Sequence, residues 1–264
     1  MNGGGVVVRC QQPCPFVIKI FVVIFCDMYY NVKVLKYNNN LHIRKGNKMI
    51  IAIDGPSGAG KSTVAKLLSK KLGFEYIDTG AMYRALAYKA SIQGIDINEI
   101  EISQMIKTTN IDYYDNSVYL DGKNVESLIR EEAISLAASK ISTFKIVREK
   151  MVEIQRKISV NKNVVLEGRD IGTKVFPDAE YKFYITASIE ERVKRRYEQL
   201  KANNIKADYH NILNDMIKRD KNDSTRQFSP LKMAEDAIFI DTSKMDLSEV
   251  TKTIAGYIGG NNVL

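Results

Sequence analysis

Nine consecutive residues form a pattern that is typical of a triphosphate-binding loop. Residues 55–63 read GPSGAGKST and match G-x-x-x-x-G-K-[ST] in full. In such a loop the glycines let successive backbone N–H groups face phosphate oxygens, and the positive end of the following helix adds to the attraction. We expect the whole loop to bind a nucleoside triphosphate, with Lys61 bridging the β- and γ-phosphates and the Ser62 hydroxyl on Mg²⁺. The loop residues are Gly55, Pro56, Ser57, Gly58, Ala59, Gly60, Lys61, Ser62 and Thr63.

The loop has the flanking segments that this chemistry requires. It directly follows the apolar run IIAID and directly precedes the helical pattern VAKLLSKKL. Short apolar runs that alternate with helical patterns predict a parallel sheet covered on both faces. These runs cover residues 49–54, 74–78, 163–168, 181–186 and 237–241. The sequence therefore predicts an α/β protein with a P-loop NTPase fold, in which helices flank a five-stranded parallel sheet.

One region departs from this alternation. Between the second and third runs, IDYYD and SVYLDG alternate polar and apolar residues around Asp115-Asn116-Ser117, as an exposed hairpin would. We interpret residues 92–133 as an inserted acceptor-binding subdomain. Helices are expected at 142–160, 188–202 and 208–222, and the region 188–230 is expected to supply a helical lid and acceptor-contacting helices.

Composition excludes several classes of protein. The formal charge is +8, but residues 1–48 hold seven bases and one acid, so the remaining chain has 32 bases and 30 acids. A nearly neutral body gives no support to a nucleic-acid-binding surface. All three cysteines lie in the same first segment, and the chain has two histidines. Disulfide frameworks, thiolate zinc sites and histidine-based triads are therefore excluded from the body.

We expect no catalytic residue in residues 1–48. Their apolar run at 16–26 is shorter than the roughly 20 residues of a membrane-spanning helix, and no small-residue cleavage site follows it. We interpret this segment as a disordered extension or a mis-assigned start, with the functional domain at 49–264. The expected location is the cytoplasm, with no membrane partner.

The loop alone does not identify the molecule that accepts the γ-phosphoryl group, because GTPases, ATPase motors and small-molecule kinases share this loop. A GTPase needs N-K-x-D, whereas the nearest match has Val164 at the Asp position. A motor would carry an apolar strand that ends in Asp, and the closest segment here, VVLEG, has Glu167 instead. Scattered arginines suggest a cage for two phosphorylated substrates. They are Arg84, Arg148, Arg169, Arg192, Arg195, Arg196, Arg219 and Arg226.

Four separated motifs, in order, make a more specific resemblance possible. They are GPSGAGKST, DTGAMYR at 78–84, EGRDIGTKVFPDAEYKFYITAS at 167–188 and RDKNDSTR at 219–226. Together they resemble the bacterial cytidylate kinases over residues 49–264. The resemblance implies phosphorylation of CMP and dCMP by ATP with Mg²⁺, in a monomer whose partners are small-molecule nucleotides.

The resemblance also implies roles for individual residues. Thr79 and Arg84 would meet the acceptor's sugar and phosphate, Ser139 and Arg148 the pyrimidine, and Arg169 the phosphates. Arg219 and Asp223 would contact the pentose, and Arg226 the base or phosphate. Arg192, Arg195 and Arg196 resemble a mobile lid over ATP, with Arg192 and Arg196 as ATP ligands. The implied catalytic residues are Lys61, Arg84, Arg169, Arg192 and Arg219.

Asp170 has an independent physical argument for its implied role. A carboxylate complements the N4 donor of cytosine and repels the O4 acceptor of uracil, so Asp170 would favour CMP over UMP. Two positions depart from the family's common residues: Glu167 stands where Asp is more frequent, and Thr79 where Ser is also common. The alternatives are another P-loop kinase, acting on UMP, AMP or shikimate, and a catalytically idle nucleotide- or RNA-binding protein anchored by its basic N-terminus.

Overall fold

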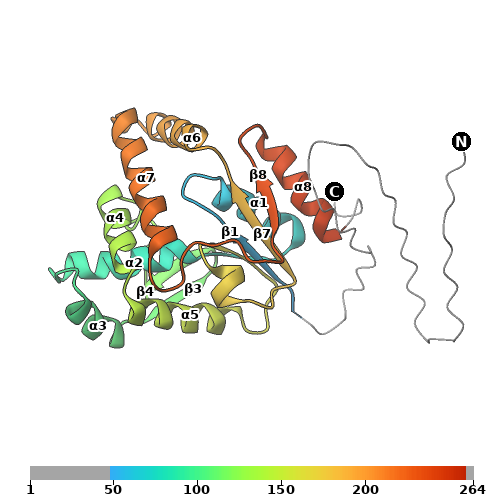
Figure 1. Cartoon of the computed structure of the whole chain (residues 1–264). Helices are drawn as coiled ribbons and strands as arrows, with labels where there is room; N and C mark the ends of the chain where they lie inside the picture. The colour runs from blue at the N-terminus through green and yellow to red at the C-terminus, as the bar shows by residue number, and fades with distance from the viewer. Residues whose placement is uncertain (1–47, 260–264) are drawn as a thin grey trace, which may run out of the picture. The chain divides into compact units, whose positions relative to one another are not determined.

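The structure is a computed structural model, and it describes residues 48–259 (Figure 1). Five strands pair in the order β2-β6-β1-β7-β8, and every pairing is parallel. Their bounds are β1 Ile50–Asp54, β2 Glu75–Asp78, β6 Val164–Gly168, β7 Tyr181–Thr186 and β8 Ile238–Asp241. The predicted five-stranded parallel sheet is confirmed. The prediction for residues 1–48 falls almost entirely outside the described residues.

Both faces of this sheet are buried, and side chains of one strand alternate between them. Ala52 of β1 packs into one apolar cluster, whereas Ile51 and Ile53 pack into the other. Helices α1 (Lys61–Leu72) and α8 (Leu247–Gly259) contribute to the cluster of Ile51 and Ile53. Helices α2 (Thr79–Ile92) and α5 (Lys145–Ser159) contribute to the cluster of Ala52. A strand of successive apolar residues is the expected sequence for a sheet covered on both faces.

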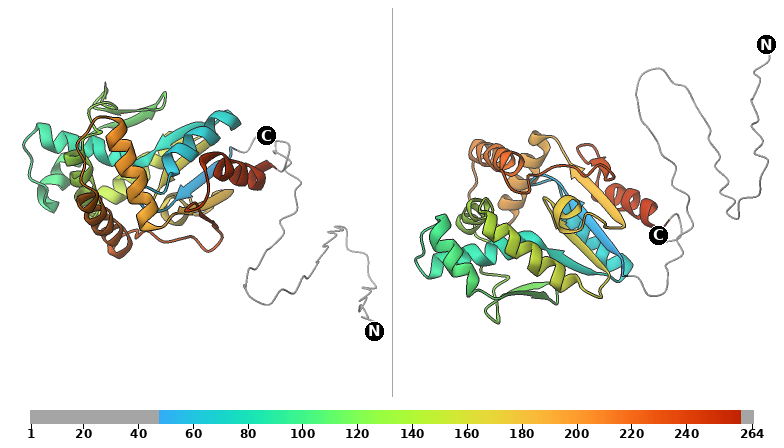
Figure 2. Two further views of the ribbon diagram at one scale, coloured as in Figure 1. Left: turned by 90° about the horizontal axis from the view of Figure 1, so that it is seen from above. Right: turned by 60° about the horizontal axis from the view of Figure 1, so that its bottom comes forward.

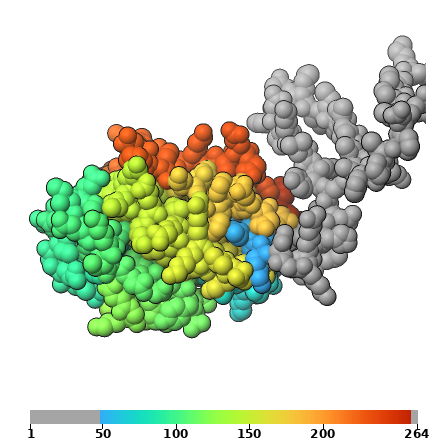
Figure 3. All heavy atoms as spheres, turned by 90° about the horizontal axis from the view of Figure 1, so that it is seen from below, coloured from blue at the N-terminus to red at the C-terminus, as the bar shows by residue number. Residues whose placement is uncertain are grey.

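The region between β2 and β6 forms a separate small sheet with its own helices. The elements are α3 Glu99–Lys107, β3 Ile111–Tyr114, β4 Ser117–Leu120, β5 Lys123–Asn124 and α4 Glu132–Ile141. Strands β3 and β4 are antiparallel, and Asp115 and Asn116 have left-handed φ values of 49° and 56° at their turn. The hairpin is exposed on one face only, because Tyr113 and Val118 are buried against the core. Figure 3 shows this region (teal to green) beside α5 (yellow-green).

The remaining elements follow the carboxyl ends of strands β6 and β7 in the chain. The short helical segment η1 (Ile171–Val175) follows β6, and α6 (Ile189–Ala202) follows β7. Helix α7 (Tyr209–Thr225) packs against α6 (Figures 1 and 2). The helix expected at 142–160 begins at Lys145, because residues 142–144 form a turn. In the part of the chain that the structure describes, no helix has the length and apolar character needed to cross a membrane.

Candidate functional site

The phosphate-binding loop has a backbone that only glycine allows at its tightest points. Gly55 has a φ of 150°, and a Cβ there would lie 1.9 Å from the carbonyl oxygen of Ile185 in β7. Gly58 has a φ of 75° and lies against Met216 of α7. Helix α1 begins at Lys61, within the nine-residue loop motif, with no side-chain cap and no acidic residue in its first turn. The positive end of α1 is therefore open to an anion.

Lys61 is buried inside this loop. Its Nζ donates a hydrogen bond to the carbonyl oxygen of Pro56 at 2.6 Å, and the residue is 5% exposed. Burial, together with the positive charge of Arg169, lowers the pKa of Lys61 to about 7. Phosphate groups beside Lys61 would favour its charged form, so this side chain is suited to a site that becomes occupied by anions.

A cavity of about 220 Å³ extends from the loop across the carboxyl ends of β2 and β6. It brings together most residues that the sequence assigned to nucleotide binding, although their roles stay predictions. Those that line it are Ser57, Gly58, Lys61, Ser62, Thr79, Arg84, Ser139, Arg148, Arg169, Asp170, Arg219, Asp223 and Arg226. The loop's Gly55, Pro56, Ala59, Gly60 and Thr63, together with Arg192 and Arg196, are outside this lining.

Arginines of the cavity are paired with buried carboxylates. Arg148 lies 2.5 Å from Asp170, and both side chains are less than 10% exposed. Arg169 donates from Nε to Asp223 at 2.8 Å, and Arg226 lies 3.5 Å from the other oxygen of Asp223. Burial acts to raise the pKa of Asp223, but Arg169 and Arg226 outweigh it and hold the pKa below its usual value. Two carboxylates, Asp170 and Asp223, thus hold three arginines of the cavity.

Several donors of the cavity have no partner among the described residues. Arg84 Nε, Arg148 Nε and Arg226 Nη2 are buried and make no hydrogen bond within this part of the chain. Arg219 makes no hydrogen bond or ion pair with another described residue, and burial together with nearby Arg169 lowers its pKa. A buried donor without an acceptor costs about 1–3 kcal/mol, or more when charged. An anionic or oxygen-rich ligand in the cavity would relieve this cost.

The arginines expected over ATP are engaged elsewhere. Arg192 is buried and donates to the Ser57 carbonyl oxygen at 3.0 Å and to Asp220 at 2.5 Å, so it links α6, α7 and the phosphate-binding loop. Arg196 pairs with Glu132 of α4 at 2.6 Å. Arg195 bonds Thr242 and Glu191. Each would have to exchange a protein partner in order to bind a phosphate.

Sequence reasoning assigned no role to several residues that line the cavity, among them Asp78 and Arg130, or to Asp54 beside the loop. Asp54, the last residue of β1, accepts the backbone N–H groups of Ile171 and Gly172 at 2.9 and 2.8 Å. Asp78 caps α2 and binds Arg84, and Arg130 lines the cavity from the segment before α4. The two aspartates end apolar strands directly before motif residues, which is a usable signal, whereas no pattern marks Arg130.

The residues beside the loop fit a magnesium ion held mainly by nucleotide phosphates and water. The Ser62 hydroxyl lines the cavity and makes no hydrogen bond with another described residue. Glu167 also lines it, and its Oε1 accepts a hydrogen bond from the Tyr76 hydroxyl at 2.8 Å. One hydroxyl and one carboxylate match the few protein ligands that Mg²⁺ takes at such sites.

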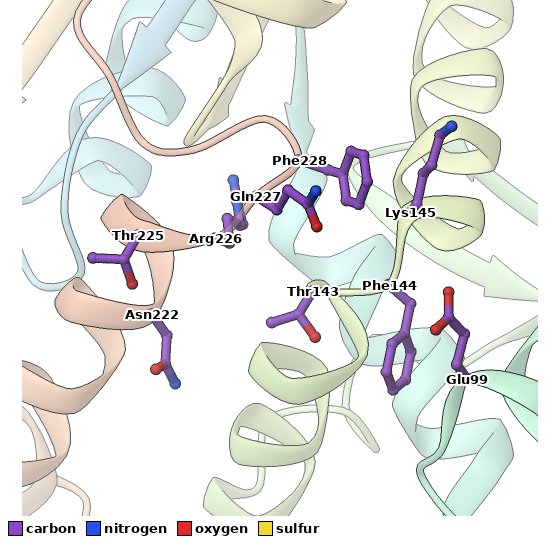
Figure 4. Close-up of a pocket in the computed structure, with 9 residues that line it drawn as sticks. All are labelled: Glu99, Thr143, Phe144, Lys145, Asn222, Thr225, Arg226, Gln227 and Phe228. Carbon is purple, nitrogen blue, oxygen red and sulfur yellow. The ribbon is translucent and has the colours of Figure 1, made fainter.

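A second cavity, of about 350 Å³, shares only Arg226 with the first one (Figure 4). Its walls come from α7 and the segment after it, from the α4–α5 turn, and from the start of α3. Lys145 lies 5.5 Å from the ring centroid of Phe228 at its edge. No other residue with an expected role in nucleotide binding lines it, so the first cavity is the candidate active site.

Over most of its length the chain is similar in sequence to known proteins. A family profile described as cytidylate kinase matches residues 51–259. A cytidylate kinase from Clostridioides difficile (strain 630) is 46% identical over 211 residues, covering 80% of this chain and 98% of that protein. A cytidylate kinase from Caldanaerobacter subterraneus subsp. tengcongensis is 49% identical over 205 residues, covering 77% and 92%. Among solved structures, a shikimate kinase from Acinetobacter baumannii is 16% identical with a TM-score of 0.40, covering 83% of this chain and 97% of that one.

Proposed function

The chain belongs to the cytidylate kinase family, whose reaction is the ATP-dependent phosphorylation of CMP, and from this premise we propose which residues carry out the transfer and that dCMP is a second acceptor. The observation that supports the assignment is the charge of the cavity. Seven cations line it: Lys61, Arg84, Arg130, Arg148, Arg169, Arg219 and Arg226. Four carboxylates line it as well: Asp78, Glu167, Asp170 and Asp223. The surplus of three positive charges suits the phosphates of two nucleotides.

The donor end of the cavity is the phosphate-binding loop. Backbone N–H groups of the loop and the start of α1 bind the ATP phosphates, and Lys61 compensates the charge on the β- and γ-phosphates. The Ser62 hydroxyl and Glu167 would hold Mg²⁺ together with the nucleotide phosphates and water. When bound, the ion would neutralise developing charge on the phosphate oxygens.

The acceptor end is formed by the arginine and carboxylate network. Arg84 and Arg169 bind the acceptor phosphate. Asp170 accepts a hydrogen bond from the cytosine N4 amino group, while Arg148 holds that carboxylate in place at 2.5 Å. Arg219, which is unpaired among the described residues beforehand, and Asp223 contact the sugar. Their resemblance to the pentose-contacting pair of the family indicates that a deoxyribose is tolerated, so dCMP is an acceptor as well.

The chemistry needs positioning more than proton transfer. The nucleophile is a phosphate oxygen of CMP, which is anionic at neutral pH, so no general base is required. The enzyme must hold two anionic groups in line and compensate their repulsion, which is the role of Lys61 and the arginines. Water must also be excluded from the γ-phosphate, and closure of α6 and α7 over the bound nucleotides would achieve this.

The test is turnover by the full chain. It is incubated with ATP, Mg²⁺ and one monophosphate at a time (CMP, dCMP, UMP, AMP or GMP), and ADP release is measured. We expect turnover with CMP and dCMP well above the others, and an Arg84→Ala variant with a higher KM for CMP and a lower kcat. Preference for UMP or AMP in a folded protein that binds ATP would assign the chain to another monophosphate kinase. Unchanged kinetics in Arg84→Ala would remove that residue from the site.

A further inference from the structure

We propose that Arg130 binds the phosphate of the acceptor nucleotide beside Arg84, and that Asp78 positions both guanidinium groups for it. This inference rests on the proposed function and adds a residue to the same site. Arg130 comes from the segment between β5 and α4, whereas Arg84 lies in the second turn of α2. The acceptor phosphate would therefore be bound from the inserted region as well as from the main domain.

The two arginines meet at a single carboxylate oxygen. Asp78 Oδ2 accepts Arg84 Nη2 at 2.8 Å and Arg130 Nη1 at 3.4 Å. The other oxygen, Oδ1, accepts the backbone N–H of Ala81 at 2.9 Å and so fixes the carboxylate at the start of α2. Asp78 is 5% exposed, so it cannot swing into solvent. Its position determines where both guanidinium groups lie.

The two guanidinium groups share one buried carboxylate. Asp78 contacts both of them, whereas the second carboxylate beside Arg130, Glu126, is partly exposed. Arg84 also has a buried Nε without an acceptor among the described residues. Burial acts to raise the pKa of Asp78, but Arg84 and Arg130 outweigh it and hold the pKa below its usual value. A phosphate dianion at this end of the cavity would give both arginines a further acceptor for their in-plane N–H groups.

Arg130 is free to make this contact. Its side chain is 46% exposed and lines the cavity. Its second partner is Glu126, four residues earlier and itself partly exposed. Ion pairs with exposed side chains stabilise a fold little, so a purely structural role for Arg130 would contribute little. A half-exposed cation between a buried carboxylate and a nucleotide cavity is instead arranged to meet an anion.

The experiment compares binding of a phosphorylated and an unphosphorylated acceptor. Calorimetry on the full chain measures the dissociation constants of CMP and cytidine for the wild type and for Arg130→Ala and Arg130→Lys. Lys123→Ala serves as the control, because Lys123 is an exposed cation of β5 that does not line the cavity. Steady-state KM and kcat for CMP, KM for ATP and thermal unfolding are measured on the same proteins.

We expect Arg130→Ala to reduce the preference for CMP over cytidine by about 10- to 100-fold, since a charge-assisted contact to phosphate is lost. Cytidine binding, the KM for ATP and the unfolding temperature should stay unchanged. Arg130→Lys should recover part of the preference, and Lys123→Ala should match the wild type.

Equal weakening of CMP and cytidine would show that Arg130 only supports the fold, and an unchanged preference would place it outside the phosphate site. Either result, in a wild-type protein that turns over CMP, overturns this inference alone. If the wild type neither turns over CMP nor prefers it to cytidine, the proposed function fails, and the role of Arg130 fails with it.

Discussion

Replacement of Asp170 by Asn tests whether one carboxylate selects the base. The substitution keeps the size of the side chain, but the new amide offers both an acceptor to cytosine N4 and a donor to uracil O4. A hydrogen bond to a charged group contributes about 1.5–3 kcal/mol, and each 1.4 kcal/mol is a factor of ten. The ratio of kcat/KM for CMP to that for UMP should therefore fall by about 10- to 100-fold in Asp170→Asn.

The same change has a structural cost that the structure lets us estimate. Asp170 and Arg148 are 5% and 3% exposed, so the substitution leaves a buried guanidinium without its counter-charge. Breaking a buried pair in this way costs about 3–5 kcal/mol, and the remaining amide oxygen lessens that cost. Domains have free energies of unfolding of about 5–15 kcal/mol, so the variant should be weakened but folded.

The assay must separate the two effects. We would measure kcat/KM for CMP and UMP together with urea unfolding, and use Lys89→Met as a control. That variant breaks another contact, between the buried Lys89 and the exposed Asp121 at 2.6 Å, away from the cavity. It should lose stability and keep the base preference. An unchanged preference in Asp170→Asn, with normal folding, would refute the assignment of Asp170 to cytosine N4.

Other predictions concern the backbone that holds the site. Burial, opposed by the N–H groups of Gly172 and Ile171, raises the pKa of Asp54 from 3.8 to about 6. Its favourable contribution to folding is thus present below pH 4 and lost as the pH rises through 6. The stability of the wild type relative to Asp54→Asn should therefore fall by about 2 kcal/mol between pH 4 and 7 in urea titrations. A constant difference would contradict this pKa. Gly55→Ala should abolish ATP binding, because the new Cβ would lie 1.9 Å from the Ile185 carbonyl oxygen. The control is Gly94→Ala, which should bind ATP normally, since Gly94 has a φ of 63° but no atom lies within 4 Å of the new Cβ. ATP binding is measured by calorimetry, and normal binding by Gly55→Ala would mean that the loop can move away from β7.

The sheet was predictable because its signals are local. Each strand is a short apolar run. The order of apolar run, GPSGAGKST and helical pattern predicts a strand, a phosphate-binding loop and a helix at the start of the domain. The hairpin was predictable from alternation, but its burial was not, since Tyr113 and Val118 are covered by helices that are distant in the sequence. The start of α5 was placed three residues early, because residues 142–144 lack a proline or glycine that would mark the turn.

The site was predictable as a set of residues but not as a network, and the difference matters for its chemistry. Arginine and aspartate positions are visible in the sequence, whereas pairing joins residues that lie far apart, such as Arg169 with Asp223, 54 positions away, or Arg130 with Asp78, 52 away. Apart from Arg219, the arginines that line the cavity are therefore already paired before a nucleotide binds. A nucleotide phosphate that binds one of the paired arginines must share it with a carboxylate or displace that carboxylate. The cost of rearranging these ion pairs reduces the net free energy of nucleotide binding. Binding then favours ligands that satisfy the unpartnered donors on Arg84, Arg148 and Arg226 together. A nucleotide with base and phosphate at the right separation can do this, and free phosphate cannot.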